Sequence, residues 1–335
     1  MEHTQYPAII ITKSAVPTIY LDTCTMIELS RHEKGNCTDA HRQEIGELYD
    51  TLAMLMRHKK VHCILGNQLQ EMGISKGRAP SRDFLFRFTN LELQHPYLIE
   101  KTQLDLGYRA YINHCPSLEL DIGMVTEHDP QPDSQFIVHV APVYSQEKLQ
   151  KTKESKLSAV AMLNNMKKNG HIEKDYATQL ETEFKSDFQV FLHTLEHAND
   201  SIESLSLYFD TLRIVCKRAG IPLAASDQEL ISAVNIHNRF LLSSYHHKLP
   251  YKHIEAVLWA TRMQRPDKIQ NGDNLDTIWA AAYLPFVHYA VTDNAFCTLL
   301  QSSGLAEHYG TNVFSHKSLN GLLEDLKSLA CIDGQ

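Results

Sequence analysis

The chain has 335 residues and a hydrophobic content of 43%, so it can bury a core and is not intrinsically disordered. A net charge of −8 argues against broad nucleic-acid binding through a basic surface, although metal ions or local basic patches could offset an acidic site. No apolar stretch has the length of a membrane span and the N-terminus lacks the features of a signal peptide, so we expect a cytoplasmic protein without membrane contact. The seven cysteines are scattered and form no CxxC pair, which argues against zinc and a disulfide framework.

The first part of the chain alternates strands with helices. Residues 18–22 are predicted to be a short strand that ends in Asp22, and residues 39–56 an amphipathic helix. Residues 61–65 are predicted to be a second strand, followed by a short helix at 67–75. This alternation is typical of a parallel α/β sheet.

The middle of the chain is different in character. Residues 75–140 give few signals, apart from a loop at 127–135 and a candidate strand at 136–143. From about residue 145 to 265 the pattern is almost entirely helical. Apolar side chains with helical spacing occur at Tyr176, Leu180, Phe184, Phe188, Phe191 and Leu195.

Two boundaries within this helical region can be predicted. Asp200 and Glu203 have the spacing of a capping box that opens a helix. Gly220 is suited to end that helix, because Pro222 follows shortly after it.

The α/β pattern then returns, with a helix entered at Asp273 and a strand at 287–293 that ends in Asp293. A helix, a last strand and a last helix are predicted at residues 294–304, 312–315 and 318–330. We therefore expect an α/β fold with a Rossmann-type parallel sheet, interrupted by a large, mostly helical insertion. The predicted division is residues 1–100, 101–265 (the insertion) and 266–335.

Carboxylates stand at comparable places in these α/β segments. Asp22 and Asp293 end strands, Glu71 follows the second strand, and Asp273 and Asp276 open a helix. Because the carboxyl ends of parallel strands meet at one crevice, these acids could converge there. Such a cluster needs a cation, and oxygen ligands favour Mg²⁺ or Mn²⁺, which suits phosphodiester hydrolysis. Each acid also has a simpler alternative, as a helix cap or a solvated residue.

Three stretches resemble the signature regions of PIN-domain nucleases: "IYLDTCTMIEL", "ILGNQLQEM" and "GDNLDTIWAAAYLPFVHYAVTDNAF". Members of this family are compact α/β metal-dependent nucleases, many of them toxins or RNA-processing ribonucleases. The resemblance covers roughly the first 75 and the last 70 residues. It implies a parallel sheet with an acidic pocket at one edge, and it does not account for the middle of the chain.

Position by position, the resemblance implies that Asp22, Glu71, Asp276 and Asp293 are catalytic residues and metal ligands. Asp273, one helical turn before Asp276, is a further candidate metal ligand, and either could be the primary third acid.

Two further positions match the family and one departs from it. Thr23 and Thr292 match small hydroxyl residues that support the site. His288 stands where many relatives carry another acid, which puts the outer part of the pocket in doubt.

The resemblance implies a Mg²⁺- or Mn²⁺-dependent endoribonuclease acting on single-stranded RNA or tRNA. Lys76, Arg78 and Arg82 could contact substrate phosphates, or could form a solvated basic loop. By analogy, the protein would be a bacterial toxin or phage-defence effector with an antitoxin or regulatory partner, and it could form a homo-oligomer. A structure-specific DNA nuclease and a non-catalytic PIN-like scaffold are the alternatives.

Overall fold

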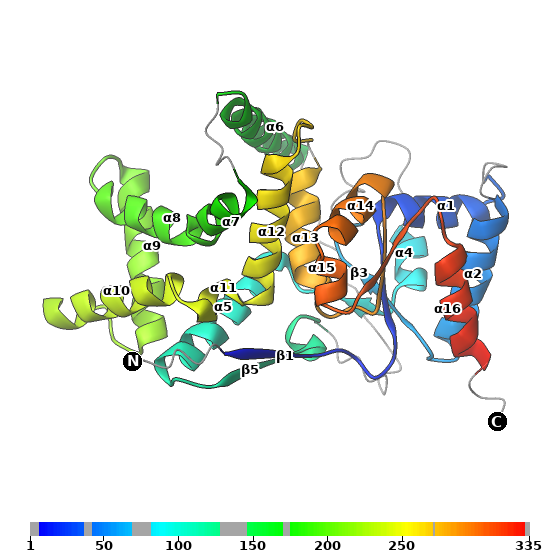
Figure 1. Ribbon diagram of the computed structural model, residues 1–335, viewed down its shortest axis with the longest axis horizontal. Coiled ribbons are helices and arrows are strands. Elements are labelled where there is room, and N and C mark those ends of the chain that lie inside the picture. The colour runs from blue at the N-terminus through cyan, green and yellow to red at the C-terminus, as the bar shows by residue number, and fades with distance from the viewer. Residues whose placement is uncertain are drawn as a thin grey trace. The chain divides into compact units, whose positions relative to one another are not determined.

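The computed structural model of the protein describes residues 7–36, 42–68, 82–127, 146–169, 175–270 and 272–331. The chain divides into two compact units, whose elements are labelled in Figure 1. One, which we call the sheet unit, contains residues 11–99, 121–171 and 266–335. The other, which we call the helical unit, contains residues 1–10, 100–120 and 172–265.

This division differs from the predicted one at two segments. Residues 121–171 belong to the sheet unit rather than to the insertion, and residues 1–10 belong to the helical unit. The predicted helix at 67–75 and the candidate strand at 136–143 lie largely or wholly outside the described residues.

The sheet unit contains a five-stranded parallel sheet, so the predicted α/β class is confirmed. Its strands, in spatial order, are β4 (Leu91–Glu92), β3 (His62–Leu65), β2 (Thr18–Leu21), β6 (Tyr289–Thr292) and β7 (Asn312–Ser315). The sheet grows from the central β2 to one side through β3 and β4, then to the other side through β6 and β7. The order of strands therefore reverses between β2 and β6, as in Rossmann-like sheets.

Helices cover both faces of this sheet. The first set is α1 (Thr23–Glu33), α2 (Arg42–Arg57), α4 (Arg82–Phe88) and α16 (Asn320–Cys331). The other helices in the described part of the unit are α6 (Gln146–Lys168), α13 (Asp273–Tyr283), α14 (Asn294–Ser302), α15 (Leu305–His308) and the short 3₁₀ helix Ile122–Met124. All four residues of β2 are buried, as expected for a central parallel strand.

Successive side chains of β2 point to opposite faces of the sheet, and their contacts show which helices cover each face. Ile19 and Leu21 point into the main core, where they meet the apolar stripe of α2 and side chains of α1, α4 and α16. Figure 1 shows α16 lying beside α2. Tyr20 points to the opposite face, where its ring stacks on Tyr283 of α13.

The chain leaves the sheet unit after α6 and re-enters it before α13, and these two points are neighbours. The Asn164 amide of α6 donates to Ile269 O at 3.0 Å and accepts from Ile269 N at 2.9 Å. Lys167 Nζ donates to Asp267 O at 2.7 Å. These contacts join the chain just before residues 172–265 to the chain just after them.

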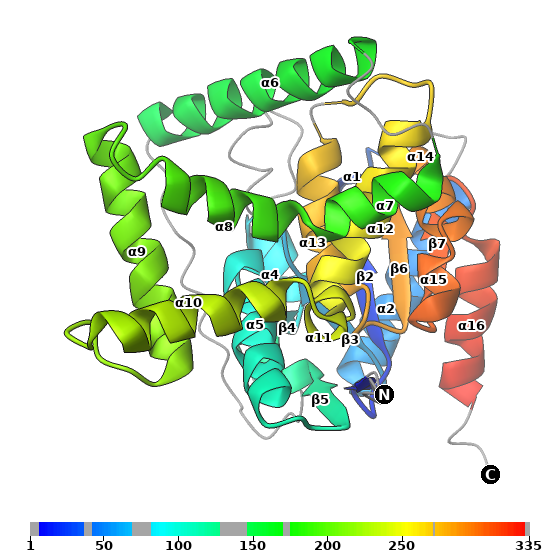
Figure 2. The same ribbon diagram turned by 60° about the vertical axis from the view of Figure 1, so that its left-hand side comes forward.

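The helical unit is built from α5 (Pro96–Ile112, which starts in the sheet unit), α7 (Tyr176–Phe184), α8 (Ser186–Glu196), α9 (Ile202–Ala219), α10 (Asp227–Leu241), α11 (Ser244–His247) and α12 (Pro250–Gln264). Figure 2 shows α9 between α8 and α10. Two strands, β1 (Ala8–Thr12) and β5 (Ser117–Asp121), pair as a separate two-stranded sheet. No helix among the described residues is long and apolar enough to cross a membrane.

Helix boundaries in this unit correct two predictions. The cap of α9 is Ser201, whose hydroxyl accepts from Ser204 N at 3.0 Å, and not Asp200. The apolar stripe predicted for 176–195 is divided between α7 and α8 at Lys185. The predicted end of α9 is confirmed, because Gly220 adopts a left-handed conformation there with φ of 69°.

An ionic network lies within the helical unit. Lys252 Nζ of α12 is 2.5 Å from Glu100, 3.0 Å from Asp187 and 3.3 Å from Glu255. The same Asp187 carboxylate is 3.0 Å from Nε2 of the buried His246. Opposite charges therefore compensate the burial of Lys252.

Candidate active site

Asp22 follows the last residue of β2 and caps α1. Its Oδ1 accepts from Thr23 N at 2.6 Å, and its Oδ2 accepts from the Cys24 thiol at 3.3 Å. Burial raises the pKa of the Asp22 carboxyl, and the negative charge of Asp293 raises it further. The two hydrogen bonds and the ring of His316 oppose this shift in pKa. The fold thus holds Asp22 in a place where its charge is poorly compensated.

Asp293 occupies the equivalent place after β6 and caps α14. Its Oδ1 accepts from Ala295 N at 2.7 Å and from Phe296 N at 3.0 Å. The parallel pairing places Leu21 opposite Val291, and Asp22 N donates to Val291 O at 2.9 Å. Both acids therefore leave adjacent strands at the same edge, where the strand order reverses and open α/β sheets bind ligands. Both do cap helices, as the simpler interpretation predicted, and both remain half-buried.

The two acids of α13 differ in their surroundings. Gly272 is the N-cap of α13, so the predicted capping role of Asp273 is wrong. Instead, Asp273 Oδ2 accepts from Gln270 N at 2.7 Å and secures the preceding loop. Burial raises the pKa of the Tyr283 hydroxyl, and the charges of Asp22, Asp276 and Asp293 raise it further. Of the pair, Asp276 is therefore the acid that shares a neighbourhood with the strand-end acids.

A polar layer supports this edge of the sheet. The Tyr20 and Tyr283 rings stack with centroids 3.8 Å apart, and the Tyr20 hydroxyl donates to Asn67 Oδ1. The Gln68 side chain donates to Leu21 O at 2.5 Å and accepts from Gly66 N at 2.6 Å. The sequence reasoning missed these residues, although two amides directly after a predicted strand were a usable signal.

His316 is another missed residue. It follows β7 directly, and its backbone N–H donates to Thr292 O at 2.9 Å. Its ring favours the charged form of Asp22. Its position after the last predicted strand could have drawn attention to it.

The two hydroxyl residues predicted to support the site behave differently. The Thr292 hydroxyl donates to Asp293 O at 3.1 Å and so stabilises the turn after β6. Among the described residues, the buried Thr23 hydroxyl has no hydrogen-bond partner. The same holds for the buried hydroxyl of Tyr283 within the described part of the chain.

Other predicted residues are not brought to this edge. Glu71, Lys76 and Arg78 lie outside the described residues, and of Arg82 only the backbone is described, as the first residue of α4. His288 lies at the opposite, amino edge of the sheet, where its Nδ1 accepts from Thr18 N at 3.0 Å. The expected link between His288 and the acidic pocket is therefore wrong.

The donor set suits a hard divalent cation. In the described part of the chain, no three His, Cys, Asp or Glu side chains are grouped closely enough to hold a metal ion by themselves. Carboxylates and hydroxyls are nevertheless the available ligands, and Mg²⁺ often binds through one or two carboxylates while keeping several waters. The residues present therefore fit a hydrated Mg²⁺ or Mn²⁺ ion better than a dehydrated one.

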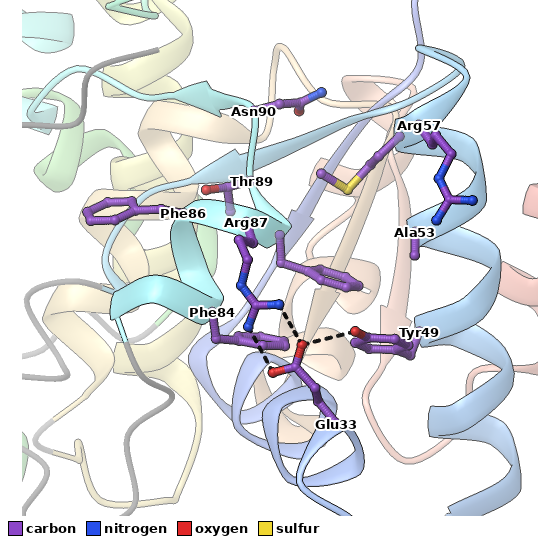
Figure 3. A pocket seen from close by; sticks show the side chains of 11 residues that line it. Glu33, Tyr49, Ala53, Arg57, Phe84, Phe86, Arg87, Thr89 and Asn90 are labelled. Atoms are coloured by element: carbon purple, nitrogen blue, oxygen red, sulfur yellow. Dashed lines mark hydrogen bonds and ion pairs between the residues drawn. The ribbon is translucent and has the colours of Figure 1, made fainter. Parts of the chain in front are cut away.

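A separate pocket of about 540 Å³ lies beside α2 and α4 and shares no lining residue with the acids (Figure 3). Arg87 donates to both Glu33 oxygens, at 2.9 and 3.0 Å, and the Tyr49 hydroxyl donates to Glu33 at 3.1 Å. Arg87 lowers the pKa of Glu33. The other lining residues are Ala53, Met56, Arg57, Phe84, Phe86, Phe88, Thr89 and Asn90. The pocket has an aromatic wall closed at one end by an ion pair.

Comparisons with protein-family models, characterised proteins and solved structures found no match to this chain.

Proposed function

We propose that the protein is a PIN-like, Mg²⁺- or Mn²⁺-dependent endoribonuclease whose active site is the carboxyl edge of β2 and β6. The observation that carries this proposal is the pairing of Asp22 with Asp293 where the strand order reverses. Two carboxylates that repel each other are costly unless a cation joins them. A cation bound at that edge would compensate the repulsion between the two carboxylates.

Each acid has a distinct part in the proposed reaction. Asp22 and Asp293 would hold the cation, which would supply electrophilic activation of the scissile phosphate and of the attacking water. Asp276 accepts a hydrogen bond from the attacking water and aligns it with phosphorus. The products carry a 5′-phosphate and a 3′-hydroxyl. Glu71 as a further ligand, and Lys76, Arg78 and Arg82 as phosphate contacts, belong to the same proposal.

The test is cleavage of labelled single-stranded RNA by the purified protein with Mg²⁺, with Mn²⁺ and with EDTA. Asp22→Asn and Asp293→Asn should each abolish cleavage that the wild type shows. Asp50→Asn, on the exposed side of α2, is the matched control and should leave cleavage unchanged. Cleavage that resists EDTA, or that survives both active-site substitutions, would contradict the proposal.

Branched DNA assayed in parallel separates RNA from DNA as substrate. Preference for the DNA would replace the endoribonuclease with a structure-specific DNA nuclease at the same site. Cation binding without cleavage of either substrate would favour a PIN-like scaffold. The proposed toxin or defence role, with a regulatory partner, would then need a different basis.

A further inference from the structure

The pocket beside α2 and α4, which we call the α2–α4 pocket, lies within the sheet unit and has the size of a small-molecule site. Its volume of about 540 Å³ falls within the roughly 300–1,000 Å³ typical of such sites. Tyr49, Ala53 and Met56, which follow one another at helical spacing, form the side that belongs to α2. Residues of α4 and of the segment directly after it form the other side.

Aromatic rings supply a flat, apolar wall of this pocket. The ring of Phe88 stacks on that of Tyr49 and on that of Phe84, with centroids 5.2 Å apart in both pairs. Phe84 and Phe88 are buried, whereas Tyr49, Met56 and Phe86 are half-buried, so the lining keeps accessible apolar surface. A planar ligand ring on this wall would gain both apolar burial and aromatic contact.

Hydrogen bonds hold the walls in place. Arg87 of α4 donates to both oxygens of Glu33, and Tyr49 of α2 donates to the same carboxylate, so Glu33 connects the two helices. Asn90 Oδ1 accepts from Cys63 N at 2.8 Å and thereby fastens the segment after α4 to β3. All of these contacts come from the protein itself, so the pocket is formed in advance, as small-molecule sites usually are.

The charges of the lining favour an anionic ligand. Two guanidinium groups, of Arg57 and Arg87, face one carboxylate, that of Glu33, which leaves one positive charge in excess. Arg87 is paired with Glu33, whereas the exposed Arg57 makes no side-chain hydrogen bond or ion pair with any described residue. Figure 3 shows the Arg57 guanidinium beside Ala53, on the face of α2 that lines the pocket. A guanidinium placed in this way can bind a carboxylate or a phosphate.

We propose that the α2–α4 pocket binds a small aromatic anion, whose planar ring rests on the aromatic wall and whose carboxylate or phosphate pairs with Arg57. Arg87 stays bound to Glu33 and closes one end of the pocket. This site is independent of the proposed function, because the pocket shares no lining residue with the acidic edge.

Displacement of a fluorescent aromatic anion, anilinonaphthalene sulfonate, from the purified protein tests the ligand class. The fluorescence of this probe rises when it enters an apolar site. Two pairs of competitors differ chiefly in the anionic group: adenosine monophosphate with adenosine, and indoleacetate with indole. At least one of the two anions should displace the probe. Its uncharged counterpart should need a roughly 10-fold higher concentration, the scale of losing one charge-assisted hydrogen bond.

Two variants test the location of the site. Arg57→Gln should weaken binding of the effective anion by roughly 10-fold and leave binding of its uncharged counterpart unchanged. Ala53→Phe should abolish binding of both, because the added ring occupies the pocket. The matched controls, Arg42→Gln and Met54→Phe, change exposed residues of α2 outside the lining and should bind like the wild type. Circular dichroism should show all four variants folded.

Displacement by adenosine monophosphate alone would support the proposal with phosphate as the anion, and displacement by indoleacetate alone would support it with carboxylate. A wild type that does not bind the probe, or from which neither anion displaces it, would overturn the proposal. So would binding that is unchanged in Arg57→Gln or in Ala53→Phe, because the probe would then lie elsewhere. Asp22→Asn should bind the probe like the wild type whether or not it cleaves RNA, so this proposal and the proposed function can fail separately.

Discussion

Asp22 makes the stability of the protein depend on pH in a defined direction. Burial raises the pKa of Asp22 above its ordinary value of 3.8. Between the pKa of the unfolded state and the higher pKa of the native state, the native state therefore binds more protons than the unfolded state. Stability is therefore lost as the pH rises through the native pKa of Asp22. Asp22→Asn removes this cost, and we expect its melting temperature at pH 7 in EDTA to exceed that of the wild type by a few degrees.

The advantage of Asp22→Asn should shrink as the pH falls toward 4, because the wild-type carboxyl then becomes neutral too. Thermal denaturation across this range measures the effect, with Asp50→Asn as the control. An advantage that stays constant with pH would mean that charge at Asp22 is not its cause.

Substitutions of the two acids of α13 are expected to affect different properties, cleavage for Asp276 and stability for Asp273. Asp276→Asn should reduce cleavage by roughly 100-fold, the scale of losing one preorganised polar group at a reacting centre. Asp273→Ala should leave most activity but cost about 1 kcal/mol of unfolding free energy, through loss of the bond from Gln270 N. Activity and urea denaturation of both variants check this. An inactive Asp273→Asn beside an active Asp276→Asn would reverse the assignment.

The positions of some of these residues could be predicted from the sequence, because they depend on local structure alone. Asp22 and Asp293 could be predicted because a carboxylate directly after an apolar strand has few possible locations. Tyr283, Asn67 and His316 could not, because their proximity depends on how strands and helices pack across the whole sheet. The side-chain partner of Asp273 was likewise invisible, since Asp is a good cap at several positions of a helix start.

At the scale of the helix, the cap of α9 gives a direct test. Ser201→Ala removes the acceptor for Ser204 N and should cost about 1 kcal/mol of unfolding free energy. Asp200→Ala is the matched control and should cost little. The prediction from sequence chose the wrong member of two adjacent good caps, a choice that only the backbone conformation decides. A larger loss from Asp200→Ala, measured by chemical denaturation, would contradict the structure here.

Two histidines, the buried His237 and the half-buried His247, should make the helical unit sensitive to acid. Burial lowers the pKa of His237 to about 3 and that of His247 to about 4, with the charges of Arg218, Lys185 and His246 adding to the effect and Asp187 opposing it. The unfolded state binds these protons near pH 6.5, so stability is full above that pH and falls as the pH drops.

His247→Phe tests this acid sensitivity, because Phe keeps the stack on Phe184 but cannot take a proton. We expect its acid-unfolding midpoint, followed by circular dichroism, to lie about 0.5 pH unit or more below that of the wild type. His58→Phe, at an exposed position outside this cluster, should leave the midpoint unchanged. An unchanged midpoint in His247→Phe would show that another group sets it.

The stripe from Tyr176 to Leu195 shows why periodicity alone can join separate helices. Lys185, between α7 and α8, keeps helical dihedral angles, and its N–H still bonds to Glu181 O and Thr182 O. The spacing of apolar residues therefore continues through the break. No propensity signal marks it.

For the whole molecule, the sequence predicted an α/β fold with a helical middle, but not how the sheet is ordered. Strand order depends on pairing between segments far apart in the chain, which local patterns do not specify. The strands β1, β4 and β5 were missed because they are short or lie in segments with weak signals; β4 has only two residues.

Each unit has its own buried residues, so we expect a core substitution to destabilise only the unit that carries it. Leu48→Ala in the sheet unit and Phe240→Ala in the helical unit, both 0% exposed, should each cost about 3 kcal/mol. Hydrogen exchange followed by mass spectrometry should show faster exchange only in the unit that carries the substitution. Faster exchange throughout both units in either variant would show that the chain unfolds as one cooperative body.

The central position of β2 also bears on how the protein is made. Thr18 at the start of β2 and His288 beside it are 270 residues apart, so the ribosome completes nearly all of the chain before β6 can pair with β2. At 5–20 residues per second, this interval lasts on the order of tens of seconds. Throughout it, Asp22 exists without Asp293. A nascent chain, or one released early by a broken message, would therefore carry half of the acidic edge, and under the proposed function it would be unable to cleave the RNA from which it is being translated.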